Sequence, residues 1–177
     1  TGEISLDMLL ECNVQYVIVG HSERRHIFHE DNELIGKKIA KIINAQIKPI
    51  LCIGETIDEM NSGKAYDVIE EQLAKGLENI KTLSNVIIAY EPVWAIGSGL
   101  TASAEKINEM HSFIRIIISK LFKEEITNRI PILYGGSVNS ENAYELISIN
   151  GVNGFLIGGA SLDVVKFTDI IKIVNDK

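Results

Sequence analysis

The sequence predicts an α/β fold of the (β/α)8-barrel type, of which the chain carries roughly five βα units. Short apolar runs rich in β-branched residues alternate with segments whose apolar residues recur at helical spacing. Strands that alternate with helices indicate a parallel sheet joined by crossover helices. No linker or low-complexity stretch interrupts this order, so residues 1–177 are expected to form one domain.

Five apolar runs are the expected strands. They are continuous rather than alternating, which is typical of strands covered on both faces. The runs are Tyr16–Val19, Ile50–Ile53, Val86–Tyr90, Ile130–Tyr134 and Phe155–Ile157.

Three apolar stripes predict helices between these strands. Each stripe repeats at intervals of three or four residues, which is one face of a helix. The stripes are Ile35, Ile39 and Ile42; Ile69, Leu73, Leu77 and Ile80; and Ile107, Met110, Ile114, Ile117 and Leu121. Ser103 is expected to cap the last of these helices, with Glu105 in its first turn.

Two architectures agree with this order, an open doubly wound sheet and a closed barrel. An open sheet gathers functional residues at one switch point, whereas a barrel places the carboxyl end of every strand on one rim. Here glycine or polar residues follow nearly every strand, at Gly20–His21, Gly54–Glu55, Glu91–Pro92, Gly135–Ser137 and Gly158–Gly159. Four repeats from Gly20 to Gly158 average about 35 residues, close to the roughly 31 expected from ~250 residues in eight units. The barrel is therefore favoured.

Composition excludes several classes of function. A net charge of −7 argues against binding to a nucleic-acid backbone, although a few local donors could still bind a small anion. Arg115 and Lys120 interrupt the best candidate for a membrane span, so no membrane segment is expected. Cys12 and Cys52 form no C-x-x-C pair and are expected to be reduced thiols of a cytoplasmic protein.

Glu91 is the first candidate functional residue. A strand-end glutamate alone would most simply be an ion-pair partner. Pro92 ends the strand ladder directly after it, and Gly97 and Gly99 allow close backbone approach to a ligand. With Trp94 as an apolar anchor between them, this order predicts a catalytic carboxylate under a lid.

His21 is the second candidate. A lone histidine is more often structural, but the charged cluster Ser22–Arg25 follows this one at the expected rim. The positive end of a helix dipole would keep the imidazole neutral, able to donate a hydrogen bond to a carbonyl oxygen. At the next strand exit Glu55 could be a second carboxylate, although a role at a helix start is favoured.

The glycine-rich exits of the last two strands predict a phosphate site. Gly135–Ser137 and Gly158–Gly159 could be ordinary turn residues, but loops after the last two strands of a barrel commonly bind phosphate through backbone N–H groups. No metal site is predicted, because His26, His29 and His111 have no partner at metal-ligand spacing.

Four motifs together resemble the triosephosphate isomerase family, whose members are TIM barrels. They are Gly20–Arg25, Ala89–Gly97, Tyr134–Ser137 and Gly158–Ser161, and the resemblance extends over the whole chain. It implies interconversion of dihydroxyacetone phosphate and glyceraldehyde 3-phosphate in glycolysis, with no metal or organic cofactor. It also implies a homodimer in the complete enzyme.

The resemblance assigns roles to individual residues. Glu91 is implied as the base and His21 as the neutral electrophile. The residues implied to bind phosphate are Gly97, Ser137, Gly158 and Gly159. Those implied to support the site are Ser22, Glu23 and Cys52, of which Cys52 is expected to pack beneath Glu91. Pro92–Ala102 is implied as the lid.

Two departures from the family pattern affect the expectations. Leu100 replaces the usual lysine at the second hinge of the lid. The family also carries three further βα units, with a substrate-binding Asn and Lys, ahead of the position of Thr1. The isolated chain is therefore expected to be inactive, and a non-catalytic phosphate-binding or interaction fragment remains the alternative to an isomerase.

Overall fold

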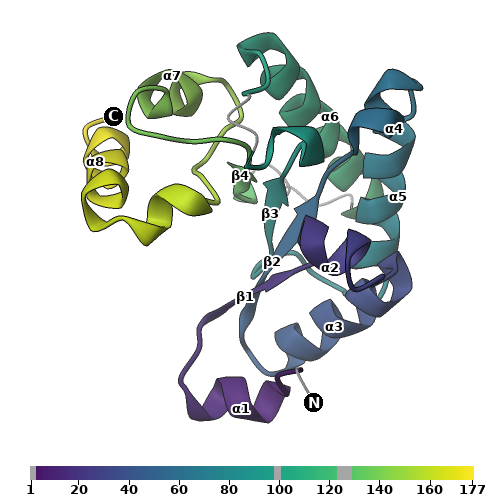
Figure 1. Cartoon of the computed structure of the whole chain (residues 1–177). Coiled ribbons are helices and arrows are strands. Elements are labelled where there is room, and N and C mark those ends of the chain that lie inside the picture. Colours follow the sequence, from purple (N-terminus) through teal and green to yellow (C-terminus); the bar gives the residue numbers. More distant parts are fainter. Residues whose placement is uncertain (1–2, 98–100, 123–128) are drawn as a thin grey trace.

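The computed structural model describes residues 3–97, 101–122 and 129–177, which form strands alternating with helices (Figure 1). The strands are β1 (Tyr16–Val19), β2 (Lys48–Ile53), β3 (Ile87–Tyr90) and β4 (Ile132–Tyr134). The helices are α1 (Leu6–Glu11), α2 (Ser22–His26), α3 (Asn32–Asn44), α4 (Ile57–Asn61), α5 (Ala65–Leu77), α6 (Ala104–Phe122), α7 (Ala143–Ser148) and α8 (Val164–Asn175), with 3-10 turns η1 (Val93–Ala95) and η3 (Gly159–Leu162).

The four strands form one parallel sheet in the order β1-β2-β3-β4, so that neighbours in the sequence are neighbours in space. Val19 lies beside Leu51, and Tyr90 lies beside both Ile53 and Tyr134. The carboxyl ends of all four strands therefore meet at one edge. This α/β arrangement is that of a TIM-barrel portion, and it brings the predicted strand exits together.

The predicted helical stripes form the core between the sheet and its helices. Figure 1 shows α3, α5 and α6 side by side along one side of the sheet, with α7 and α8 together on the other side of the view. The predicted apolar residues of α3 and α5 are almost fully buried, as are four of the five in α6. Burying each such side chain contributes about 1.5–3 kcal/mol. The exceptions are Leu121, which is largely exposed, and Ile80, which lies beyond the end of α5.

Side chains at the helix starts fix where these helices begin. Asp31 accepts a hydrogen bond from the backbone N–H of Leu34 at 2.7 Å, and Thr56 and Glu59 form a reciprocal capping box at α4. Ser103 accepts from the N–H of Lys106 at 3.3 Å, as predicted for α6. These bonds satisfy N–H groups that have no acceptor inside the helix.

Two predicted strands differ from the structure. The run from Ile130 is strand only from Ile132 onward, because Pro131 has no N–H for the ladder and offers only its carbonyl, to Ile88. The predicted fifth strand at Phe155–Ile157 is wrong as a strand, since only Phe155 forms a single parallel bridge, with Tyr134.

Strand β1 lies at the edge of the described sheet, and one of its faces is open. Tyr16 and Ile18 are 47% and 51% exposed, so the expectation of strands covered on both faces is wrong for β1. Toward the other end of the chain, the exposed apolar side chains include Leu162, Val164, Val165, Phe167 and Ile171. Apolar surface is thus open on both β1 and the region of α8.

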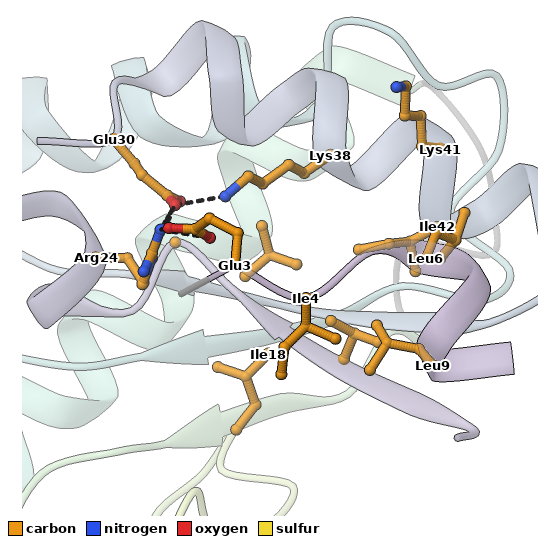
Figure 2. Close-up of a pocket in the computed structure, with 13 residues that line it drawn as sticks. Glu3, Ile4, Leu6, Leu9, Ile18, Arg24, Glu30, Lys38, Lys41 and Ile42 are labelled. Carbon is orange, nitrogen blue, oxygen red and sulfur yellow. Dashed lines mark hydrogen bonds and ion pairs between the residues drawn. The ribbon is translucent and has the colours of Figure 1, made fainter. Parts of the chain in front are cut away.

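A hollow of about 390 Å³ beside β1 contains an ion-pair cluster that the sequence did not reveal (Figure 2). Glu30 is buried and accepts hydrogen bonds from both Arg24 and Lys38, while Arg24 also donates to Glu3 at 2.9 Å. Burial alone would raise the pKa of Glu30, but the bonds from Lys38 and Arg24 hold that pKa below its usual value. The cluster ties the residues before α1 to α2 and α3.

Candidate active site

His21 and Glu91 meet at the carboxyl edge of the sheet. His21 follows β1 and Glu91 follows β3, and the His21 Nε2 atom lies 3.4 Å from Glu91 Oε1. His21 is also the N-cap of α2, where its Nδ1 atom accepts the backbone N–H of Glu23 at 3.4 Å. An accepting Nδ1 leaves the proton on Nε2, so the arrangement is that of a neutral imidazole with its donor facing the carboxylate.

Glu91 is a buried carboxylate, with a side chain only 4% exposed. Burial raises the pKa of Glu91, and the neighbouring His21, Cys52 and Arg25 oppose that rise. A carboxylate with a raised pKa is a stronger base than an exposed one. The site therefore has a group suited to removing a proton from carbon.

Cys52 and Arg25 lie close to this carboxylate. Cys52 is fully buried, and burial followed by the charge of Glu91 raises the pKa of its thiol. The Arg25 guanidinium donates to the carbonyls of Gly20 and Cys52, at 2.6 and 3.0 Å, which joins the exits of β1 and β2. Cys52 is thus buried next to Glu91, and the contacts that Arg25 makes between the two strand exits were not predicted.

Two glycines pack directly against Glu91. A Cβ atom on Gly54 would lie 1.7 Å from the Glu91 carbonyl oxygen, and one on Gly135 would lie 2.7 Å from Glu91 Cγ. No side chain fits at such distances without moving the backbone of Glu91, in the case of Gly54, or its side chain, in the case of Gly135. Close packing against Glu91 is therefore enough to require glycine at position 135, whether or not this residue also binds an anion.

A cavity of about 590 Å³ extends from the His21–Glu91 pair to the glycine-rich loops. Most of the predicted site residues line it: His21, Glu23, Glu91, Gly97, Ser137, Gly158 and Gly159. Two predicted supporting residues do not line the cavity. Cys52 is fully buried, and Ser22 is the first residue of α2. Among the described residues, no atom beyond the chain neighbours lies within 4 Å of where a Cβ of Gly158 or Gly159 would be, so the described structure leaves this backbone open to a ligand.

The predicted lid is described on both sides of residues 98–100. Gly97 has a φ of +64°, which favours glycine, and Ala102 donates its N–H to the Tyr134 hydroxyl at 3.3 Å. The Thr101 hydroxyl donates to the carbonyl of Ser137 at 3.4 Å. These bonds join the end of the lid to the exit of β4. Gly99 and Leu100 lie outside the described residues.

Glu55 has a different role from the one the sequence favoured. Thr56, not Glu55, caps α4, and the Glu55 carboxylate is fully buried. It accepts hydrogen bonds from the Tyr90 hydroxyl at 3.1 Å and from the Trp94 indole N–H at 3.0 Å. Glu55 thus holds Trp94 in η1, which begins two residues after Glu91. No local sequence signal marks a contact between residues 39 positions apart.

His111 is a second buried histidine, and its environment lowers its pKa to about 4. Burial is the main cause and the charge of Arg115 adds to it, while a hydrogen bond with the Gly151 carbonyl opposes it. Because the unfolded state takes up a proton near pH 6.5 and the folded state only near pH 4, acidification between these values favours unfolding.

As the pH drops from 6.5 to 4, we expect the free energy of unfolding of the wild type to fall by about 3 kcal/mol relative to that of the His111→Asn variant. Urea unfolding of both proteins at several pH values measures this difference. The comparison cancels the other titrating groups, since asparagine does not titrate. A difference that stays constant with pH would contradict the lowered pKa.

Two kinds of feature are absent from the described residues. No group of three or more His, Cys, Asp or Glu side chains there is arranged to hold a metal ion. None of the helices described is both long and apolar enough to cross a lipid bilayer.

Comparison with known proteins agrees with the motifs of this site. The family profile described as "Triosephosphate isomerase" matches residues 1–174. Proteins named triosephosphate isomerase from Chlamydia trachomatis serovar D and Francisella tularensis subsp. mediasiatica are 47% and 49% identical to the chain over 99% of its length. One from Mycoplasmoides gallisepticum is 47% identical over 97%.

The chain spans only part of the length of these relatives. It covers 64% of the Chlamydia protein, 70% of the Francisella protein and 69% of the Mycoplasmoides protein. The match nevertheless includes all four motifs that meet at the carboxyl edge of the sheet. The chain belongs to the triosephosphate isomerase family.

Proposed function

We propose that this chain carries the base, the electrophile and the phosphate loops of a triosephosphate isomerase. The enzyme would interconvert dihydroxyacetone phosphate and D-glyceraldehyde 3-phosphate, a step of glycolysis and gluconeogenesis. The observation that carries the proposal is the 3.4 Å approach of His21 Nε2 to Glu91 Oε1 in a cavity that Gly158 and Gly159 also line.

In the proposed mechanism Glu91 removes a proton from the carbon beside the substrate carbonyl and returns it to the neighbouring carbon. His21 donates its Nε2–H to the carbonyl oxygen, on which negative charge develops as the enediolate forms. These are the roles for which the triosephosphate isomerase family is a standard example. The buried position of Glu91 and the accepting Nδ1 of His21 support them.

Backbone groups are proposed to hold the substrate phosphate. Gly97, Ser137, Gly158 and Gly159 lie around the same cavity, and Gly159 opens the turn η3, whose first N–H groups have no acceptor within the turn. Supporting roles are proposed for Ser22, Glu23 and Cys52. A lid over residues 92–102 would exclude water and so protect the enediolate from losing phosphate.

The remaining proposals rest on family membership. The complete enzyme is proposed to be a homodimer in the cytoplasm, acting on a small phosphorylated substrate. A non-catalytic fragment that retains only phosphate binding is the second candidate, and the apolar surface open on β1 favours it for the chain by itself.

Replacing Gly97 with valine tests the proposed phosphate site. We expect the affinity of the purified chain for 2-phosphoglycolate, whose carboxylate imitates the charge of the enediolate, to fall about tenfold, or ~1.4 kcal/mol. The reason is the φ of +64°, which a β-branched residue adopts only with strain. Isothermal titration calorimetry measures the change.

Gly63→Val is the matched control. Gly63 has a similar φ of +73°, is exposed between α4 and α5, and lies outside the cavity. This variant should lose comparable stability, about 1–2 kcal/mol, yet bind 2-phosphoglycolate like the wild type. Unchanged affinity in Gly97→Val would show that Gly97 does not contribute to anion binding.

A further inference from the structure

His111 is a buried side chain that the proposed chemistry does not use. It lies on the inner face of α6 and is only 1% exposed. Its Nδ1 atom is 3.0 Å from the Gly151 carbonyl oxygen, so Nδ1 carries a proton and donates it. The Nε2 atom is buried and has no hydrogen-bond partner among the described residues. The ring is therefore fixed by one hydrogen bond at one end.

The acceptor of that bond begins the segment that enters the cavity. Gly151 has a φ of +87°, and the chain then runs through Phe155 to Gly158 and Gly159. Sheet pairing secures this segment weakly, since Phe155 forms only one bridge with Tyr134. The course of the segment depends on a few further hydrogen bonds.

Those further bonds connect the segment to β4 and α6. The Asn153 side chain accepts the N–H of Ile132 at 2.9 Å and a bond from Arg115 at 3.2 Å. The N–H of Leu156 donates to the Tyr134 carbonyl at 3.0 Å. Because Arg115 is one helical turn from His111, α6 contacts the segment at two places, the Gly151 carbonyl and the Asn153 side chain.

The other side of the His111 ring faces the strand that carries the base. The ring packs edge-on against Tyr90, with centroids 6.0 Å apart, and Tyr90 directly precedes Glu91. One side chain thus contacts both β3 beside Glu91 and the start of the segment that leads to Gly158.

We propose that His111 is a positioning residue, whose Nδ1–H sets the placement of residues 151–159 relative to Glu91. The inference rests on the proposed function, because it assumes that residues 151–159 help to bind a phosphate. His111 touches no substrate in this scheme. Its effect passes through the Gly151 carbonyl and along the backbone to Gly158 and Gly159.

Three substitutions separate the hydrogen bond from simple packing. His111→Asn keeps an N–H donor at the place of Nδ1, whereas His111→Gln moves the donor toward the place of Nε2, where the described part of the chain offers no acceptor. His111→Leu removes the donor and keeps the bulk. Ser112→Ala, at the exposed neighbour on α6, is the matched control.

Binding of inorganic phosphate to the purified full chain is the first measurement, followed through the amide NMR signals of Gly158 and Gly159. We expect His111→Asn and Ser112→Ala to stay within about twofold of the wild-type Kd, and His111→Gln and His111→Leu to bind about tenfold more weakly. Equal Kd values for the Asn and Gln variants would overturn the proposal, because the position of the donor would then not matter.

Amide hydrogen exchange is the second measurement, and it does not depend on a ligand. In His111→Gln the Asn153 and Leu156 amides, which donate to the Ile132 and Tyr134 carbonyls, should exchange about tenfold faster, while the Ile88 amide in the sheet stays unchanged. A wild-type chain that binds no phosphate would contradict the proposed function. The hydrogen-exchange rates would still test the inference about His111. That inference fails if the Asn153 and Leu156 amides exchange at the same rate in His111→Asn as in His111→Gln.

Discussion

A polypeptide of residues 1–177 alone should self-associate and show no measurable isomerase turnover. The apolar side chains open on β1 and near α8 include Ile18 at 51% and Leu162 at 91% exposure. At roughly 25 cal/mol per Å², a few hundred exposed Å² forfeits several kcal/mol, a large part of the ~5–15 kcal/mol stability of a domain. Strand β1 also offers unpaired backbone groups at the sheet edge to another chain.

Light scattering and a coupled isomerase assay test this expectation. Co-expression with the three βα units that the family resemblance predicts ahead of Thr1, taken from the Francisella relative, should restore turnover and reduce self-association. Tyr16→Lys, which places a charge on the open face of β1, should reduce self-association without restoring turnover. A monodisperse monomer of the 177 residues with turnover equal to that of the co-expressed protein would refute the prediction.

In the co-expressed protein, Glu91→Asp should lower kcat by about a hundredfold and change KM little. The shorter side chain withdraws the carboxylate from its place 3.4 Å from His21, and misplacement of ~1 Å can cost on the order of 10²-fold in rate. The backbone has little room to compensate, because Gly54 and Gly135 already pack against Glu91. Steady-state kinetics in both directions measures the change.

Glu141→Asp is the control for this substitution, since Glu141 is an exposed glutamate outside the cavity. It should leave both kinetic constants within about twofold of the wild type, as most surface substitutions do. If Glu91→Asp instead raised KM with kcat intact, Glu91 would be a binding group and the proposed base would have to be sought elsewhere.

Local patterns in the sequence predicted the parts of the fold that depend on local spacing. The stripe through Ile107 and Ile114 identified the buried face of α6, and residues at the strand exits identified His21 and Glu91 as neighbours. Both inferences follow from geometry that every helix and every parallel sheet shares. The sequence was sufficient wherever such general geometry decided the outcome.

Contacts between distant residues were not predictable in the same way. Glu55 shows no local sign that Tyr90 and Trp94 will donate to it, and nothing near Glu30 indicates that Lys38 will pair with it inside a hollow. The strand at Phe155 failed for a related reason. Its apolar run satisfies strand propensity, but a strand also needs a neighbour along its length, which only the three-dimensional arrangement decides.

The order of the sheet has a consequence for synthesis on the ribosome. Tyr16 pairs with Lys48, Ile50 with Ile87, and Ile88 with Ile132, so each strand joins the one that emerged just before it. At ~5–20 residues per second, successive strands emerge seconds apart, whereas helices form in about a microsecond. Each βα unit therefore has time to dock on the growing sheet before the next appears. The residues that meet at the cavity would be assembled in chain order, with Gly158 and Gly159 added last.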